Sequence, residues 1–276
     1  MDMMTFFSEE SRREAEALAH RSIASLIGNE GRTAVVTGAA RGIGLAISHR
    51  LVESGAYVVL ADLRADDLAK ARDSFPQAFR ARTATLEVDV TRADAVRALA
   101  ETAVARTGRL DIWVNNAGIF PPSGAIQEAE DTVFQQILAV NVQGVFMGAR
   151  EAARHMVGKG VILNIASIGA IRGQNGMSGY SASKHAVAGL TRSLALELGK
   201  FGIRVMAIAP GLTVSPGNAE ALERVQAAGH KLASLSAPLG RIALADDVAR
   251  VALFSVSDMA AMMTGQILVI DGGTTA

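Results

Sequence analysis

Short apolar segments rich in β-forming residues alternate with helix-like segments along most of this chain. Helical spacing of apolar residues is found over about 43–54, 93–106, 126–157, 180–200 and 245–256. Strands are predicted at 33–37, 57–61, 85–88, 110–114, 161–165, 203–208 and 266–270. Continuously apolar strands separated by helices are typical of a parallel sheet that is covered on both faces. The alternation therefore predicts a single α/β domain.

Two regions do not follow this alternation. Residues 1–30 carry mixed charge and apolar residues at helical spacing up to Gly28-Asn29, so we expect an N-terminal helical extension. Residues 212–240 contain proline, glycine and only a weak helical pattern, which is typical of a lid beside an active site. The catalytic domain is then expected to span 31–276.

The composition argues against several classes of function. Lys plus Arg and Asp plus Glu are each 27, so the formal net charge is zero and no nucleic-acid partner is expected. Cysteine is absent, which excludes thiol catalysis, disulfides and Cys-ligated metals. The five histidines lack metal-ligand spacing, so no metal site is expected. Neither a signal peptide nor a membrane span is indicated, and we expect a cytoplasmic protein.

A glycine-rich turn follows the first predicted strand. It reads Thr37-Gly38-Ala-Ala-Arg41-Gly42-Ile43-Gly44 and leads into a predicted helix. Such glycines let the backbone turn tightly and approach a pyrophosphate, which the N-terminus of the next helix attracts. The spacing differs from the standard dinucleotide motif. The alternative is a glycine-rich connection that serves only close helix–strand packing.

An acidic residue ends the second predicted strand. Asp62 lies 24 residues after Gly38, where an acid is expected to bind the adenosine ribose hydroxyls. Two like charges about 4 Å apart at an effective dielectric near 20 cost about 4 kcal/mol, so Asp62 favours NAD over NADP. Arg41 and Arg64 could instead pair with a 2′-phosphate, and Asp62 could be a helix N-cap.

A tyrosine and a lysine stand four residues apart in a later predicted helix. Tyr180 and Lys184 would therefore face the same side. A phenol is a poor base at neutral pH, and a neighbouring ammonium is expected to lower its pKa. The pair could then act as a general acid and base between a hydroxyl and a carbonyl. An isolated pair of this kind is more often an ordinary surface pair.

Taken together, these motifs resemble the short-chain dehydrogenase/reductase family in its compact form of about 250 residues. The resemblance covers roughly 31–273, and Ser167 precedes Tyr180 by 13 residues, the usual family spacing. The matching motifs are the glycine turn, Asp89-Val90, Asn115-Asn116-Ala117-Gly118, Asn141, Ser167, the Tyr180/Lys184 pair, Pro210-Gly211, and Thr264-Gly265-Gln266 with Asp271-Gly272-Gly273.

The resemblance implies a role for each of four catalytic residues. Tyr180 would exchange a proton with the substrate oxygen, and Ser167 would hydrogen-bond that oxygen. Lys184 would lower the pKa of Tyr180 and hold the nicotinamide ribose. Asn141 would position a water that links Lys184 to solvent.

The resemblance also implies a set of cofactor-binding residues, with NAD as the expected cofactor. Arg41 and Ile43 would contact it from the turn, Asp62 would bind the ribose, and Asn116 would contact the nicotinamide side. The implied set is Gly38, Arg41, Gly42, Ile43, Gly44, Asp62, Leu63, Asp89, Val90, Asn116, Ala117, Gly118, Tyr180, Lys184, Pro210, Gly211, Thr213 and Ser215. After Pro210-Gly211 the usual threonine position is Ser215, with Thr213 earlier.

By the same resemblance, we expect a doubly wound sheet of seven strands in the order 3-2-1-4-5-6-7, and a homotetramer or homodimer. The expected function is NAD-dependent oxidation of an apolar secondary alcohol, alicyclic or aromatic. The substrate would contact 168–178 and the predicted lid. The alternatives are an NADP-dependent reductase resembling 3-oxoacyl-carrier-protein reductases, and a catalytically silent nucleotide sensor.

Overall fold

The computed structural model describes residues 13, 16–121, 125–215 and 237–276. Seven parallel strands in this part of the chain form one sheet in the order β3-β2-β1-β4-β5-β6-β9. Their bounds are β1 (Thr33–Thr37), β2 (Tyr57–Asp62), β3 (Thr83–Glu87), β4 (Ile112–Asn115), β5 (Gly160–Ile165), β6 (Ile203–Pro210) and β9 (Ile267–Ile270). The predicted α/β fold and strand order are confirmed.

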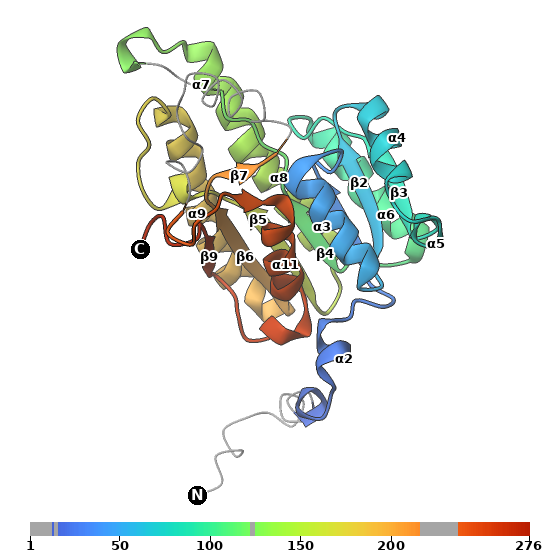
Figure 1. Cartoon of the computed structure of the whole chain (residues 1–276). Helices are drawn as coiled ribbons and strands as arrows, with labels where there is room; N and C mark the ends of the chain where they lie inside the picture. The colour runs from blue at the N-terminus through green and yellow to red at the C-terminus, as the bar shows by residue number, and fades with distance from the viewer. Residues whose placement is uncertain (1–12, 14–15, 122–124, 216–236) are drawn as a thin grey trace, which may run out of the picture.

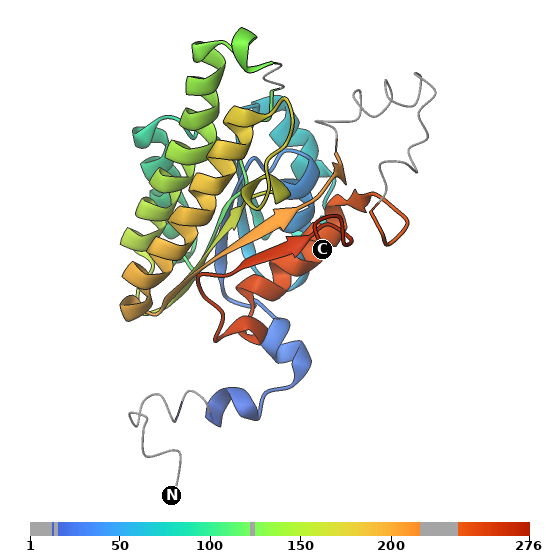
Figure 2. The same cartoon turned by 90° about the vertical axis from the view of Figure 1, so that its left-hand side faces the viewer.

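Helices cover both faces of this sheet (Figures 1 and 2). The α-helices of the described ranges include α2 (Ile23–Ile27), α3 (Gly42–Glu53), α4 (Ala65–Asp73), α5 (Gln77–Arg80), α6 (Ala93–Thr107), α7 (Asp131–Leu138), α8 (Gly144–His155), α9 (Ser178–Leu198) and α11 (Ala245–Val256). Helices α3 and α11 pack together on one face. Helices α6, α8 and α9 contribute to the core on the other face. No helix in the described ranges is long and apolar enough to cross a membrane.

The five inner strands, β2, β1, β4, β5 and β6, are buried, and their successive side chains enter opposite layers. In β1, Ala34 and Val36 belong to the core beneath α3 and α11, whereas Val35 belongs to the core beneath α6 and α8. In β2, Leu60 and Val59 divide in the same way. A strand buried on both faces must be apolar throughout, which is why the sequence pattern was continuous rather than alternating.

The long helix predicted over 126–157 is divided in the structure. A short 3-10 helix (Ile126–Glu128) precedes α7, and a π turn, η3 (Ala139–Gln143), joins α7 to α8. Buried Asn141 lies in that turn. Its amide accepts a hydrogen bond from the N–H of Ile119 and donates one to its carbonyl, each at 2.9 Å, which fixes the irregular turn to the loop after β4.

Other boundaries also differ from the predictions. Strand β3 starts at Thr83, two residues before the predicted 85–88. Helix α4 was not predicted, because only Leu68 and Ala71 on it are buried and its apolar pattern is correspondingly weak.

The regions outside the alternation are described in part. The described end of the N-terminal extension contains α2, which packs beside η7 (Asp258–Ala260), and Arg21 pairs with Asp258. The predicted lid begins near β7 (Thr213–Val214), which pairs with β8 (Ala243–Leu244). Most of the lid, 216–236, lies outside the described residues. The division at residue 30/31 stays a prediction.

Candidate active site

The glycine turn lies where the strand order reverses, between β1 and β4. Gly38 and Gly42 have positive φ values of 63° and 58°, which side chains rarely adopt. A Cβ on Gly38 would approach Ala117 Cα to 2.9 Å, and one on Gly44 would approach Gly38 O to 2.3 Å. The backbone therefore packs too closely here for larger residues, and the turn leaves its outer side open to a ligand.

The N-terminus of α3 opens onto this turn. Arg41 is its N-cap residue, with no side-chain capping bond, and the first helical turn carries no acidic residue. Helix α3 has 12 residues, so its first N–H groups and its dipole favour an anion at this end. A pyrophosphate fits the arrangement.

Asp62, at the end of β2, closes one end of the adjacent cleft. Its carboxylate is buried, and one oxygen accepts a hydrogen bond of 3.1 Å from the N–H of Ala40 in the turn. Arg64 Nε lies 3.6 Å from Asp62 and 3.1 Å from Asp67. The charge of Arg64 is therefore shared between two carboxylates.

Twelve of the predicted cofactor residues line this cleft of about 390 Å³: Gly38, Arg41, Gly42, Ile43, Asp62, Leu63, Asp89, Val90, Asn116, Ala117, Gly118 and Ser215. Gly44 does not line it and serves the close packing of the turn. Arg64, which the sequence analysis considered as a partner of a 2′-phosphate, lines it too, and sequence reasoning missed four further lining residues, namely Val88, Ile119, Phe120 and Val140.

The loop after β4 is tied to the glycine turn through two side chains. Asn116 Nδ2 donates to the carbonyls of Thr37 and Gly38 at 2.8 and 2.9 Å. Thr37 Oγ1 accepts from the N–H groups of Asn116 and Ala117, both at 3.1 Å. These bonds hold the two walls of the cleft in register. The predicted contact between Asn116 and a ribose stays a prediction.

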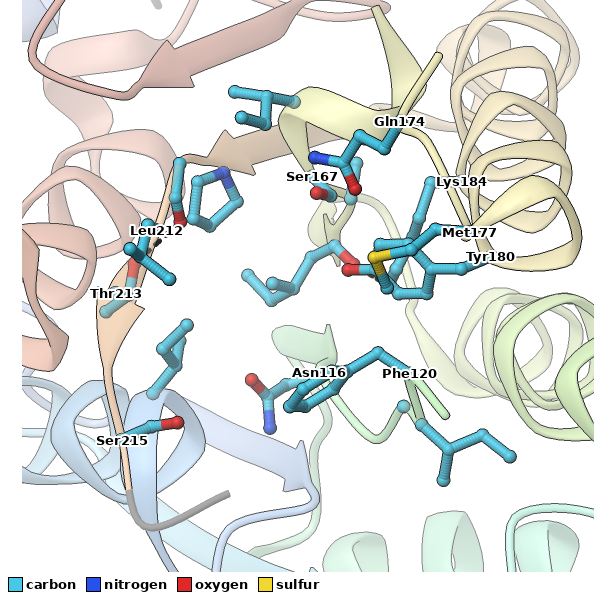
Figure 3. A pocket seen from close by; sticks show the side chains of 18 residues that line it. Asn116, Phe120, Ser167, Gln174, Met177, Tyr180, Lys184, Leu212, Thr213 and Ser215 are labelled. Carbon is cyan, nitrogen blue, oxygen red and sulfur yellow. Dashed lines mark hydrogen bonds between the residues drawn. The ribbon is translucent and has the colours of Figure 1, made fainter. Parts of the chain in front are cut away.

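Tyr180, Lys184 and Ser167 meet in an adjoining cavity of about 520 Å³ (Figure 3). Tyr180 and Lys184 come from α9, and Ser167 lies just after β5 as the N-cap of η4 (Ile168–Ala170). Burial raises the pKa of Tyr180, while its hydrogen bond with Ser167 acts in the lowering direction. The ring of Phe120 meets that of Tyr180 edge-on, with centroids 6.3 Å apart.

Lys184 is not hydrogen-bonded to Tyr180. Its Nζ donates a hydrogen bond of 2.8 Å to the carbonyl of Ile165 and lies 5.7 Å from the centroid of the Tyr180 ring. Burial lowers the pKa of Lys184 to about 8. The pKa of Tyr180 is raised in this structure rather than lowered as expected, because burial of the phenol outweighs the hydrogen bond with Ser167, and the effect of Lys184 on Tyr180 stays a prediction.

Asn141 stands behind this pair rather than in the cavity lining. Besides its bonds to Ile119, its Nδ2 donates to Ser183 Oγ at 3.1 Å. A Cβ on Gly118 would lie 3.3 Å from Asn141 Oδ1 and 3.6 Å from Lys184 Nζ. Asn141 and Lys184 therefore both lie close to Gly118. The water relay predicted between them stays a prediction.

The rest of the cavity wall is mostly apolar, with Gln174 as a polar residue beside Met177 (Figure 3). Of the predicted 168–178 segment, Ile168, Gln174 and Met177 line the cavity, whereas Arg172 and Asn175 do not. Pro210, Gly211, Thr213 and Ser215 also line it, and Figure 3 shows Thr213 and Ser215 across the cavity from Tyr180. Their predicted contact with the cofactor stays a prediction. Phe120, which sequence reasoning missed, lies two residues after the Asn-Asn-Ala-Gly motif and lines both cavities.

No group of three or more His, Asp or Glu side chains in the described ranges could hold a metal ion. The arrangement instead offers an anion-binding turn, a buried acid and a hydroxyl pair beside an apolar cavity. These are the groups that a dinucleotide-dependent exchange of hydride and proton requires.

Comparison with known proteins shows which family the chain resembles. A family model described as Enoyl-(Acyl carrier protein) reductase matches residues 38–275. The chain is 42% identical over 250 residues to cis-4-hydroxycyclohexanecarboxylate dehydrogenase of Sinomonas cyclohexanicum, covering 89% of this chain and 97% of the relative. It is 40% identical to tropinone reductase-like 2 of Erythroxylum coca, covering 88% and 90%.

A solved structure shares the fold as well. A short-chain dehydrogenase/reductase (glucose/ribitol dehydrogenase) from Brucella melitensis superposes with a TM-score of 0.83 at 31% identity, covering 90% of this chain and 98% of that one. Fold, site and sequence similarity agree, and the chain belongs to the short-chain dehydrogenase/reductase family, whose members act on CH–OH groups with NAD(H) or NADP(H).

Proposed function

We propose that this protein oxidises an apolar, alicyclic secondary alcohol to its ketone with NAD⁺. The observation that carries the proposal is the position of Tyr180 and Ser167 in a largely apolar cavity that adjoins the cleft ending at Asp62. The nicotinamide, when bound, accepts the hydride from the carbinol carbon. The chain itself must bind the alcohol, exclude water and remove the hydroxyl proton.

Ser167 and Tyr180 are placed to act on the substrate oxygen. Ser167 Oγ holds the alcohol oxygen by a hydrogen bond and stabilises the negative charge that develops there. Tyr180, as phenolate, accepts the hydroxyl proton while the carbinol carbon loses a hydride, which a bound nicotinamide would accept. Because the pKa of Tyr180 is raised, its phenolate is a stronger base, but only a small fraction of the phenol is ionised at neutral pH.

Lys184 and Asn141 act on the position of these groups. Lys184 is held by the Ile165 carbonyl at the cavity edge, where its remaining N–H groups are available to a ribose hydroxyl. Asn141 fixes the Ile119 backbone that borders both cavities. Both are positioning residues for the nicotinamide half of the site.

The preference for NAD follows from the surroundings of Asp62. Its buried carboxylate would lie against an adenosine 2′-phosphate and repel it. Arg64 offers limited compensation, because Asp67 also binds its guanidinium. The remaining cation in this cleft wall, Arg41, lies on the turn where a pyrophosphate would bind.

An alicyclic substrate fits both the cavity and one relative. The wall contains Phe120, Met177 and Leu212, which suit a ring, and the relative from Sinomonas cyclohexanicum is named for a hydroxycyclohexane acid. We further propose a cytoplasmic homotetramer or homodimer. Exposed Phe146 and Leu196 on α8 and α9 support an association surface.

The test is absorbance of the reduced nicotinamide during incubation with cyclohexanol derivatives and either NAD⁺ or NADP⁺ at alkaline pH. Turnover with NAD⁺ that is lost in Tyr180→Phe supports the proposal. Faster turnover with NADP⁺ would replace it with the ketone-reductase alternative. NAD binding without turnover of any alcohol in the panel would favour the silent sensor.

A further inference from the structure

A second large cavity, of about 570 Å³, lies at the opposite edge of the sheet from the active site. The N-terminal ends of β1, β4, β5 and β6 border it, together with Leu18 and Arg21 of the N-terminal extension. In Figure 1 the extension lies at the far end of the sheet from α7 and β7. The family-model match starts at residue 38, after the extension and Arg32, so part of this wall lies outside the matched region.

The wall of this cavity carries an excess of positive charge. The cations are Arg21, Arg32, Arg109, Lys159 and Arg204, and the acids are Glu30, Asp111 and Asp258. Two pairs neutralise each other, because Arg21 binds Asp258, and Arg109 binds Asp111 at 2.5 Å. Glu30 turns its carboxylate toward Gly28, where a Cβ would lie 2.4 Å from Oε2.

Arg32 and Arg204 form no ion pair in the described ranges, although Asp258 acts on both from a longer distance and Asp111 acts on Arg32. Among the described residues neither has a carboxylate within 4.0 Å, and their hydrogen-bond acceptors are neutral oxygens and the sulfur of Met206. Three of these are the carbonyls of Ser255, Val256 and Ser257 at the C-terminus of α11. Burial, reinforced by the charge of Arg32, lowers the pKa of Arg204 to about 10.

Capping α11 does not use all the donors of Arg32. Its Nη1 donates to Asn29 Oδ1 at 2.9 Å and to the Val256 carbonyl at 3.0 Å, while Nε and Nη2 have no partner in the described ranges. Fully buried side-chain nitrogens in those ranges all have partners, since Ser181 Oγ is the unpartnered atom there. The remaining N–H groups of Arg32 are therefore not fully buried, and Arg32 lines this cavity.

We propose that this cavity binds the phosphate group of a small phosphate monoester, with Arg32 and Arg204 as its principal ligands. A guanidinium presents parallel N–H donors that match phosphate oxygens, and a dianion would neutralise two adjacent cations. The volume is sufficient for a small phosphorylated molecule rather than an ion alone. The site is separate from the glycine turn and does not depend on the proposed reaction.

The test measures binding of radiolabelled inorganic phosphate to the full-length protein by equilibrium dialysis, in chloride buffer of constant ionic strength with saturating NADH. Gly158 lines the cavity, and a Cβ there would meet nothing within 4 Å. Gly158→Asp and Gly158→Asn share the same shape and backbone strain but differ in charge. We expect the Asp variant to bind phosphate about tenfold more weakly than the Asn variant.

A second pair of variants tests the arginine directly. Arg32→Gln is expected to weaken phosphate binding at least tenfold, whereas Arg97→Gln, which removes an exposed charge from α6, leaves it unchanged. Absence of saturable binding by the wild type would overturn the proposal. So would equal affinity in the two Gly158 variants, or competition by malonate as effective as that of unlabelled phosphate.

Discussion

The amine of Lys184 is bonded to the carbonyl of Ile165, the last residue of β5, and not to the phenol of Tyr180 one helical turn away. This bond of 2.8 Å joins α9 to the carboxyl edge of the sheet inside the candidate active site. Lys184 is therefore held by the sheet, so the four-residue spacing brings the two side chains to one face of α9 without bonding them to each other.

Tyr180→Phe should lower kcat for alcohol oxidation by about 10² to 10⁴, because it removes the group that accepts the proton. The dissociation constant for NADH should change little, as followed by NADH fluorescence. Tyr57→Phe is the matched control, because Tyr57 lies on β2 away from both cavities. Equal loss of activity in the two variants would remove Tyr180 from the mechanism.

The pH profile of oxidation should reflect the raised pKa of Tyr180. The phenolate becomes more abundant as pH rises, so kcat/KM for oxidation should increase with pH, with its limb centred above the ordinary phenol value of 10.0 in the free enzyme. Ketone reduction needs the protonated phenol and should fall over the same range. A limb centred near neutrality would show that other groups control the proton transfer.

The stability of the folded protein should rise between about pH 8 and pH 10, because the pKa of Lys184 is lowered from 10.5 to about 8. Over this range the unfolded chain keeps the Lys184 proton while the folded chain releases it, so the free energy of unfolding increases with pH. Each pKa unit contributes about 1.4 kcal/mol. Urea denaturation should show this slope in the wild type and a flatter one in Lys184→Met.

Asp62→Ala should shift cofactor preference toward NADP. Losing the carboxylate removes a repulsion of about 4 kcal/mol from a nearby phosphate charge and also removes a ribose hydrogen-bond acceptor. We expect kcat/KM with NADP⁺ to rise at least tenfold and that with NAD⁺ to fall. Asp66→Ala, on the first turn of α4, is the control and should leave the ratio unchanged.

Gly38→Ala should reduce NAD affinity and stability together. Its Cβ would have both a positive φ of 63° and a contact of 2.9 Å with Ala117 Cα. Gly31→Ala has φ of 73° with nothing within 4 Å, so it isolates the backbone strain of about 1 kcal/mol. Thermal denaturation should show the larger loss for Gly38→Ala, and calorimetry should show lost NAD binding only there.

The fold was predictable because the strands are buried on both faces and their apolar segments stand apart from the helices between them. The glycine turn, Asp62 and the Tyr180/Lys184 pair were predictable for a related reason. Each lies at the carboxyl end of a strand or on one helix face, where spacing along the chain decides position.

The sequence contains no comparable signal for contacts between segments that lie far apart along the chain. Lys184 meets Ile165 across 19 residues, and Phe120 enters the cavity through the course of a loop. The division of the helix at Asn141 depends on amide bonds to Ile119, 22 residues earlier. Hydrophobic periodicity reports burial within one element and carries no information on such pairings.

The π turn at Ala139–Gln143 makes the site depend on the number of residues in the chain as well as on their identity. Deleting one residue there would favour a regular helix and rotate α7 relative to α8 by about 100°. Phe134 and Ile137, which lie against Gly179 beside Tyr180, would then turn away from α9. The number of residues between Ile119 and Tyr180 is thus constrained, and a substitution cannot test this constraint because it leaves that number unchanged.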